Sequence, residues 1–239
     1  NAAGIQSSGA TGSVQTNSRG FSSTANYVYN GSTTQVTGTG LPANVNNLTI
    51  NNSSGVTLSG STQVNGNLSL VSGLSIGSDN TLTINGTVSG SGGLTGGQYS
   101  GLSVTGSGDL YMPAISTLKQ LSLNRAGTAY LGSDLVIHNT LDLYTDLALN
   151  GYTLTLLGTV PTRNGVLIAG GNSSLVVDGN GQVILPGISS TLKDLTIGAD
   201  SIVTTQSVIT VTDSFVNNGS IDVGTYGVTG SGSSVNNGT

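Results

Sequence analysis

Few side chains in this sequence have the chemistry and spacing of a catalytic or metal site. His138 is the single histidine, and cysteine is absent. Because zinc sites combine several Cys or His ligands, we interpret His138 as a surface or turn residue. Asp142 and Asp146 lie close in sequence, and paired carboxylates are what glycoside hydrolysis requires. Alternation along this segment directs Asp142 to solvent and places Asp146 in the next turn, which favours two solvated acids over catalysis.

Two further groups of residues suggest binding. Residues 178–182 (Asp-Gly-Asn-Gly-Gln) faintly resemble a calcium loop. They lack the additional carboxylates of such loops, so a tight turn is the favoured interpretation. The eight tyrosines outnumber the other aromatic residues and suit contact surfaces, although packing at the core rim is the favoured alternative. The sequence therefore predicts no catalytic, metal-binding or cofactor-binding residue, and we expect a protein that is not an enzyme.

The composition indicates a surface built from hydroxyl and amide groups rather than ions. Only 6% of the residues are charged, against about 25% in ordinary globular domains. All ten acidic residues are aspartate, and the formal charge of −5 disfavours a nucleic-acid partner. No apolar run approaches the length of a membrane span, so no membrane insertion is expected. The sequence begins at Asn1 without an initiating methionine, which is typical of a processed chain or a fragment.

Apolar triplets recur along the chain with a short period of about 20 residues. Examples are the intervals from Leu48 to Leu68 and from Leu121 to Leu141. Each triplet alternates apolar, polar and apolar, and Gly-, Asn- and Ser-rich turns separate the triplets. The pattern predicts an all-β fold, a right-handed parallel β-helix with about 20 residues and three short strands per coil. A string of small β-sandwich domains is the rival interpretation, but sandwich strands are usually longer.

A longer repeat divides the chain into three units. Leu-Pro or Met-Pro occurs at 41–42, 112–113 and 185–186, each time between two apolar triplets. We therefore expect one solenoid domain over 21–239 with long repeats at about 21–97, 98–170 and 171–239. Residues 1–20 form a Gly- and Ser-rich arm that is expected to be mobile by itself. The arm is predicted to pack on a neighbouring subunit.

The two ends of the predicted solenoid suggest self-assembly. Ile5 and Val14 are the chief apolar anchors of the arm, and the segment containing Phe215 is echoed by the segment containing Val235. A solenoid end without a cap exposes unpaired strand edges that invite edge-to-edge addition. These four residues are therefore the predicted assembly residues.

One segment of the sequence resembles a known class of repeats. It comprises residues 38–52 (Gly-Thr-Gly-Leu-Pro-Ala-Asn-Val-Asn-Asn-Leu-Thr-Ile-Asn-Asn) and the triplets that follow as far as Gly86. They resemble the repeats of the extracellular β-solenoid surface and adhesin-like proteins of type-IX-secreting bacteria. The likeness covers most of 21–239, and it implies an extracellular or cell-surface location with an adhesive or structural role.

Three hypotheses for the function follow. The first is a structural subunit of an extracellular filament or surface layer, which joins head to tail through its ends and has itself as its main partner. The second is an adhesin segment that binds polysaccharide or another cell surface. The third, disfavoured, is a polysaccharide-degrading enzyme that would depend on Asp142 or Asp146. No cofactor is expected for any of them.

Overall fold

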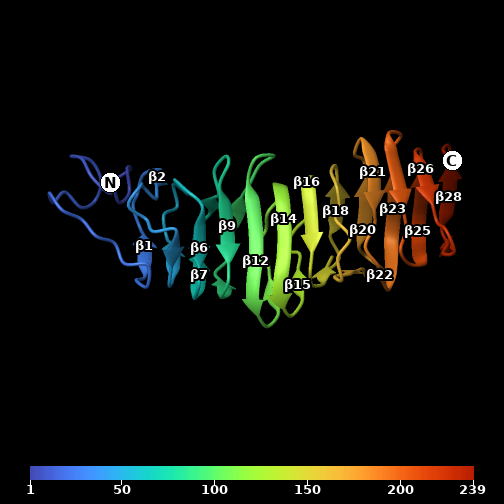
Figure 1. The fold of residues 1–239 in the computed structure, drawn as a ribbon, viewed down its shortest axis with the longest axis horizontal. Helices are drawn as coiled ribbons and strands as arrows, with labels where there is room; N and C mark the ends of the chain where they lie inside the picture. The colour runs from blue at the N-terminus through green and yellow to red at the C-terminus, as the bar shows by residue number, and fades with distance from the viewer.

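The short apolar triplets fold into a stack of coils. In the computed structural model, which describes all 239 residues, the chain forms an all-β parallel solenoid of about ten turns without a helix. Figure 1 shows the coils following one another along an elongated molecule, with the two ends of the chain at opposite ends of the long axis. The predicted parallel solenoid and its coil length are confirmed.

Each early coil contributes one strand to each of three parallel sheets. One sheet holds β1 (Tyr27–Tyr29), β4 (Leu48–Ile50), β7 (Asn67–Leu70) and β10 (Thr87–Ser89). A second holds β2 (Gln35–Val36), β5 (Val56–Thr57), β8 (Leu74–Ser75) and β11 (Leu94–Thr95). The third sheet begins with β3 (Asn44–Val45), β6 (Thr62–Val64), β9 (Thr81–Ile84) and β12 (Gly101–Ser107). The triangular cross-section follows from three short strands separated by turns.

The third sheet extends through the whole molecule and two shorter sheets complete the later coils. It continues with β14 (Thr117–Ala126), β16 (Leu135–Leu143), β18 (Thr153–Leu156), β20 (Ser174–Val177), β23 (Thr191–Ile197), β25 (Ile209–Asn217), β27 (Val228–Gly230) and β28 (Ser233–Asn236). A five-stranded sheet holds β13 (Leu110–Tyr111), β15 (Ala129–Tyr130), β17 (Leu147–Ala148), β19 (Leu167–Ile168) and β22 (Ile188–Ser189). A three-stranded sheet holds β21 (Gly181–Ile184), β24 (Ser201–Thr204) and β26 (Ser220–Asp222).

Several strands are much longer than the predicted triplets. β14 spans ten residues, and its register against β16 shifts between Leu118 and Gln120. Leu118 pairs with Ile137 on one side of the shift, and Leu121 pairs with Leu141 on the other. The strand therefore bends around a corner of the solenoid without an intervening turn. This bend carries the third sheet from one face of the solenoid to the next.

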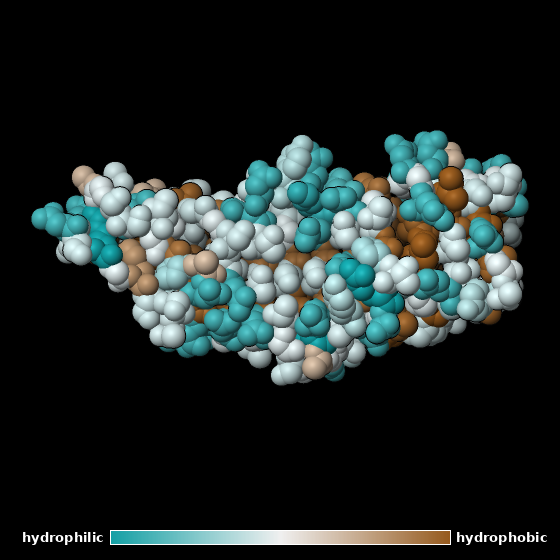
Figure 2. All heavy atoms as spheres, viewed as in Figure 1, coloured by the Kyte–Doolittle hydropathy of each residue, from teal (hydrophilic) through white to brown (hydrophobic).

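A continuous apolar core fills the space between the faces. Leu82, Leu102, Leu121 and Leu141 stack in register on four successive coils, and all four are fully buried. They belong to one cluster of 46 buried hydrophobic residues that includes members from Tyr29 to Val211. Because this core is unbroken, the alternative of separate sandwich domains is wrong. Figure 2 shows hydrophilic and neutral residues over most of one face, with hydrophobic atoms gathered toward the C-terminal half.

Neighbouring coils approach closely at glycines in the corners. A Cβ atom on Gly86 would collide with the carbonyl oxygen of Gly66 in the preceding coil. A Cβ atom on Gly158 would collide in the same way with the carbonyl oxygen of Asn139. Such contacts are sterically forbidden, so these corners require glycine. The abundance of glycine thus follows in part from the close spacing of stacked coils.

Candidate functional site

His138 and Asp142, which the sequence offers as candidates for chemistry, both contact residues of neighbouring coils in the structure. The Nε2 atom of His138 lies 3.1 Å from Oγ1 of Thr117 on the preceding coil. Asp142 accepts a hydrogen bond of 2.9 Å from Nε of Arg163. These contacts place both side chains in links between coils.

The second acid of the sequence pair has a different partner. Asp146 accepts a hydrogen bond of 3.0 Å from the backbone N–H of Val166, one coil further along. Asp142 and Asp146 therefore have different hydrogen-bond partners, and their interpretation as solvated acids rather than catalytic residues stays a prediction. Residues 178–180 connect β20 to β21, and the carbonyl oxygen of Gly179 accepts a hydrogen bond from the hydroxyl of Ser201 at 2.9 Å. Gly181 and Gln182 are the first residues of β21, so the segment predicted as a tight turn is a three-residue connection followed by the start of a strand.

The N-terminal arm lies against the first coil of its own chain. The N–H of Ile5 donates to the carbonyl oxygen of Thr37 at 3.0 Å, and the N–H of Val36 donates to that of Ala2 at 2.9 Å. The N–H of Gly40 in turn donates to the carbonyl oxygen of Ile5 at 2.9 Å. The start of the arm thus hydrogen-bonds along the outer edge of β2 and its continuation. Within the single chain, this contact covers an edge that would otherwise be open. Packing of the arm on a neighbouring subunit stays a prediction.

Ile5 also lies over the N-terminal end of the core. Ile5, Tyr27 and Tyr29 line a cavity of about 240 Å³ between the arm and β1. Tyr29 is buried, and its hydroxyl donates to the carbonyl oxygen of Thr37 at 2.8 Å. Burial raises the pKa of the Tyr29 phenol above its ordinary value, with a smaller contribution from Tyr27. The neutral phenol therefore closes this end of the core.

The C-terminal end of the core is open by comparison. One inward side chain from each of β25, β26 and β27 is only partly buried and packs on the core: Phe215, Ile221 and Val228. Their register partners one coil earlier are fully or almost fully buried: Leu195, Val203 and Ile209. Within residues 1–239, these apolar side chains are thus less covered than their partners in the preceding coil.

A cleft in the last coil exposes part of this interior. It has a volume of about 170 Å³, and its lining residues are Val211, Phe215, Val228, Thr229, Gly230, Gly232, Ser233 and Ser234. Ser234 of β28 pairs in register with Phe215 of β25. A small polar side chain thus follows a stack of large apolar side chains. The replacement of a large side chain by serine leaves room in this stack. We refer to this space, with these lining residues, as the terminal cleft.

The structure separates the two C-terminal residues that the sequence predicts for assembly. Phe215 lines the terminal cleft. Val235 pairs with Val216, is 46% exposed and is absent from the cleft lining. The two residues therefore contribute to different surfaces of the same end. For both of them, as for Ile5 and Val14, a role in assembly stays a prediction.

Asparagine side chains form hydrogen bonds between the last two coils. Nδ2 of Asn217 donates to Oδ1 of Asn236 at 2.8 Å, and Nδ2 of Asn237 donates to Oδ1 of Asn218 at 2.8 Å. The repeated Val-Asn-Asn-Gly sequence thus stacks in register, because identical amides bond each other across adjacent parallel strands. These side-chain bonds hold the coil that forms the rim of the terminal cleft.

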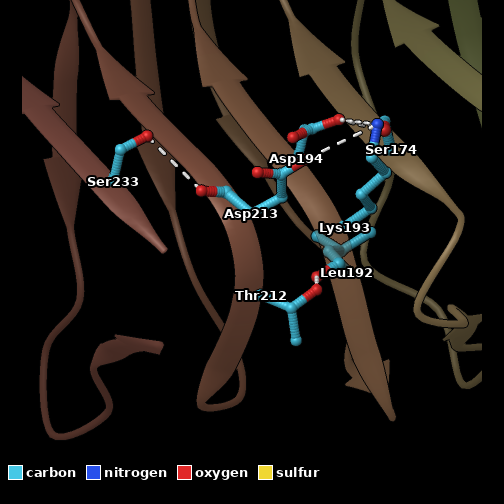
Figure 3. Close-up of polar contacts among 7 residues, drawn as sticks. All are labelled: Ser174, Leu192, Lys193, Asp194, Thr212, Asp213 and Ser233. Atoms are coloured by element: carbon cyan, nitrogen blue, oxygen red, sulfur yellow. Dashed lines mark hydrogen bonds and ion pairs between the residues drawn. The ribbon is translucent and has the colours of Figure 1, made fainter. Parts of the chain in front are cut away.

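Charged side chains lie on β23 and β25, on the coils that precede the C-terminal coil. Nζ of Lys193 lies 3.5 Å from Oδ2 of Asp194 and 3.7 Å from Oδ2 of Asp213 (Figure 3). Ser233, a cleft residue, donates its hydroxyl to the carbonyl oxygen of Asp213 at 3.4 Å. The Asp213 side chain is 65% exposed, so its carboxylate faces solvent beside the cleft.

The side-chain charges are distributed unevenly along the rod. Residues 1–78 contain Arg19 and no acidic residue, whereas residues 194–239 contain four aspartates and no lysine or arginine. The aspartates are Asp194, Asp200, Asp213 and Asp222. The N-terminal end is therefore weakly positive, and the C-terminal end is negative even when Lys193, which pairs with Asp194 and Asp213, is included. Two copies arranged head to tail would bring opposite charges together.

Sequence reasoning missed Arg125, which is 2% exposed. Its guanidinium donates to the carbonyl oxygens of Gly108 and Thr105 at 2.5 Å, and to that of Ser107 at 2.6 Å. A longer contact of 3.4 Å reaches the carbonyl oxygen of Asn85, two coils away. Asn85, Thr105 and Arg125 each lie one coil apart in sequence, and this spacing was the one available signal.

Burial lowers the pKa of the Arg125 guanidinium, and the charge of Asp109 partly offsets this effect. Arginine remains protonated even so, because its ordinary pKa is far above neutral. Arg125 therefore ties three consecutive coils together as a charged donor to backbone carbonyls. This is a structural role in the interior of the rod, remote from both ends.

Two aromatic arrangements lie on the surface of the middle coils. The rings of Tyr111 and Tyr130 stack with centroids 4.5 Å apart and an interplanar angle of 16°. Tyr111 is 67% exposed. The guanidinium of Arg163 lies 4.7 Å from the ring centroid of Tyr144, a cation–π contact. The register between β13 and β15 creates the tyrosine pair.

The chain matches no known family model, and neither curated proteins nor solved structures show a significant similarity to it. The structure contains no helix that is long and apolar enough to cross a membrane. The fold therefore places the chain among β-solenoids.

Proposed function

We propose that this protein is a structural subunit of an extracellular filament or surface layer, in which rods join head to tail. The observation that carries the proposal is the difference between the ends of one continuous core. The arm hydrogen-bonds to the first coil at one end, where Tyr27 and Leu41 are partly buried, whereas no further segment of the chain covers Phe215, Ile221 and Val228 at the other. Open parallel strand edges and unsatisfied apolar area both favour the addition of a further coil-like surface. The resemblance to repetitive surface proteins of type-IX-secreting bacteria supports the extracellular location.

Head-to-tail contact gives an open filament rather than a closed ring when successive subunits stack along one axis. The opposite charges of the two ends would orient the subunits before contact. The low content of lysine and arginine also offers few cleavage sites to trypsin-like proteases. That property suits a protein exposed outside the cell.

Self-association is expected to weaken as salt rises from about 50 mM to about 500 mM NaCl, because salt screens the charges of the ends. Sedimentation velocity and negative-stain electron microscopy of the purified chain measure the mass and shape of the assemblies. The double variant Asp213→Asn/Asp222→Asn should weaken association, because it removes negative charge from one end. Asp79→Asn removes a charge outside both ends and serves as the control. A chain that stays monomeric at every concentration and salt tested would contradict the proposal.

A second candidate function is an adhesin segment that binds polysaccharide. The specific observation in its favour is the Tyr111–Tyr130 stack, because exposed aromatic rings provide platforms for sugar rings. Monomers would then bind a neutral glycan on an array in a saturable manner, and Tyr111→Ala would abolish binding. Tyr226→Ala is the matched control, since Tyr226 is also exposed (47%) and lies near the C-terminal end. Equal binding by both variants would reject this site.

A further inference from the structure

We propose that the terminal cleft of one copy receives Val14 from the arm of a second copy. This inference rests on the proposed head-to-tail assembly and names the contact that makes it. The cleft offers apolar surface from Val211, Phe215 and Val228. Its volume of about 170 Å³ exceeds the roughly 150 Å³ of a cavity that accommodates benzene. One branched aliphatic side chain therefore fits.

Val14 is the side chain of the arm that best matches this space. Among residues 7–20 it is the single branched aliphatic residue, and it is 36% exposed. The loop that presents it is organised rather than free. Arg19 donates to the carbonyl oxygens of Gln6 and Gly9 from its guanidinium, and the N–H of Ser13 donates to the carbonyl oxygen of Gly4 at 2.7 Å. A loop held in this way loses less conformational entropy when it binds.

Charge supports the same arrangement. The partners of Arg19 are neutral carbonyl groups, so the loop retains its positive charge. Asp213 lies on the same strand as Val211 and Phe215, and its carboxylate is 3.7 Å from Nζ of Lys193. Asp200 and Asp222 add further negative charge to this end of the rod. Docking of Val14 would bring the positive loop next to the negatively charged end. Like-charged ends would repel each other, so the charges also select head-to-tail over tail-to-tail contact.

The position of the loop is compatible with end-on contact. Figure 1 shows the arm projecting beyond β1 at one extremity of the rod, while β28 and the C-terminal coil form the other extremity. The part of the arm that covers β2 comprises residues 1–7, and Val14 lies outside it. The arm can therefore cover its own first coil and still present Val14 to another molecule.

The absence of cysteine permits a direct crosslinking test on the full chain. A Val14→Cys variant is mixed with a Ser234→Cys variant, because Ser234 lines the cleft, and the mixture is oxidised. The expected result is a mixed disulfide dimer, since disulfides form only where the Cβ atoms approach to about 4 Å. Val28→Cys replaces Val14→Cys in the control, because Val28 is also exposed near the N-terminal end. A yield of mixed dimer from Val14→Cys that is no greater than the yield from Val28→Cys would overturn the proposal.

An affinity measurement complements the crosslinking. Val14→Ser is expected to raise the dissociation constant for self-association about ten- to hundredfold, the effect of losing one buried valine contact. Ala10→Ser, in the same loop, should leave it unchanged, and circular dichroism verifies that both variants fold. Unchanged association of Val14→Ser overturns the Val14 contact and leaves head-to-tail assembly standing. A wild-type chain that never associates instead overturns the proposed function itself and, with it, the contact.

Discussion

Replacement of Arg125 by methionine is expected to lower the free energy of unfolding by about 2–3 kcal/mol, because a hydrogen bond to a charged group contributes about 1.5–3 kcal/mol. Methionine has similar length but no donors, so the partly buried carbonyl oxygens of Thr105, Ser107 and Gly108 lose their charged partner. Because Ser107 and Gly108 are exposed, water offsets part of the loss. Urea denaturation followed by far-UV circular dichroism measures the change through the shift of the transition midpoint.

Arg163→Met is the matched control for this change. Arg163 is partly exposed and contacts Asp142 and the ring of Tyr144 at the surface. Surface pairs contribute up to about 1 kcal/mol, so the control should destabilise much less. Equal losses of stability for the two variants would show that water satisfies the three carbonyl groups when Arg125 is absent. The proposed role of Arg125 in tying the coils together would then be wrong. Arg125→Lys should recover only part of the stability, because a single ammonium cannot reproduce the planar fork of donors.

The second large effect is expected for Leu121→Ala, which should lower the free energy of unfolding by about 3–5 kcal/mol. Leu121 is fully buried between Leu102 and Leu141 in adjacent coils. The cavity would interrupt the stack near the middle of the rod, where neighbours on both sides hold its walls apart. Because coils in a solenoid stabilise their neighbours, the damage extends beyond one coil.

Hydrogen exchange locates this damage. Amides of β12, β14 and β16 should lose protection first, while the coils near both ends retain theirs. Ser122→Ala is the control on the same strand, because Ser122 occupies the alternate, outward position of the strand. Its effect should stay within about 0.5 kcal/mol. A comparable loss for Ser122→Ala would mean that the assignment of the inward face is incorrect.

The sequence alone determined the kind of fold. Apolar triplets at a spacing of about 20 residues predict stacked coils, because each triplet records locally which side chains face the interior. Residues such as Leu48 and Leu68 therefore fell in register as expected. The pattern also favoured solvated acids over a catalytic pair for Asp142 and Asp146, and this stays a prediction.

The tertiary structure alone decided how the ends are built and what ties the coils together. Turns of unequal length accumulate shifts between coils, so the partner of a polar residue cannot be read from its neighbours in sequence. Arg125 lies one coil after Thr105, but only the packing shows that its side chain is buried against carbonyl groups of earlier coils. The repeated Val-Asn-Asn-Gly sequence pairs Ser234 with Phe215, but only the structure shows the terminal cleft that lies beside this pair. Backbone hydrogen bonds between the arm and β2 join segments that lie far apart in the chain, and local periodicity does not encode such contacts.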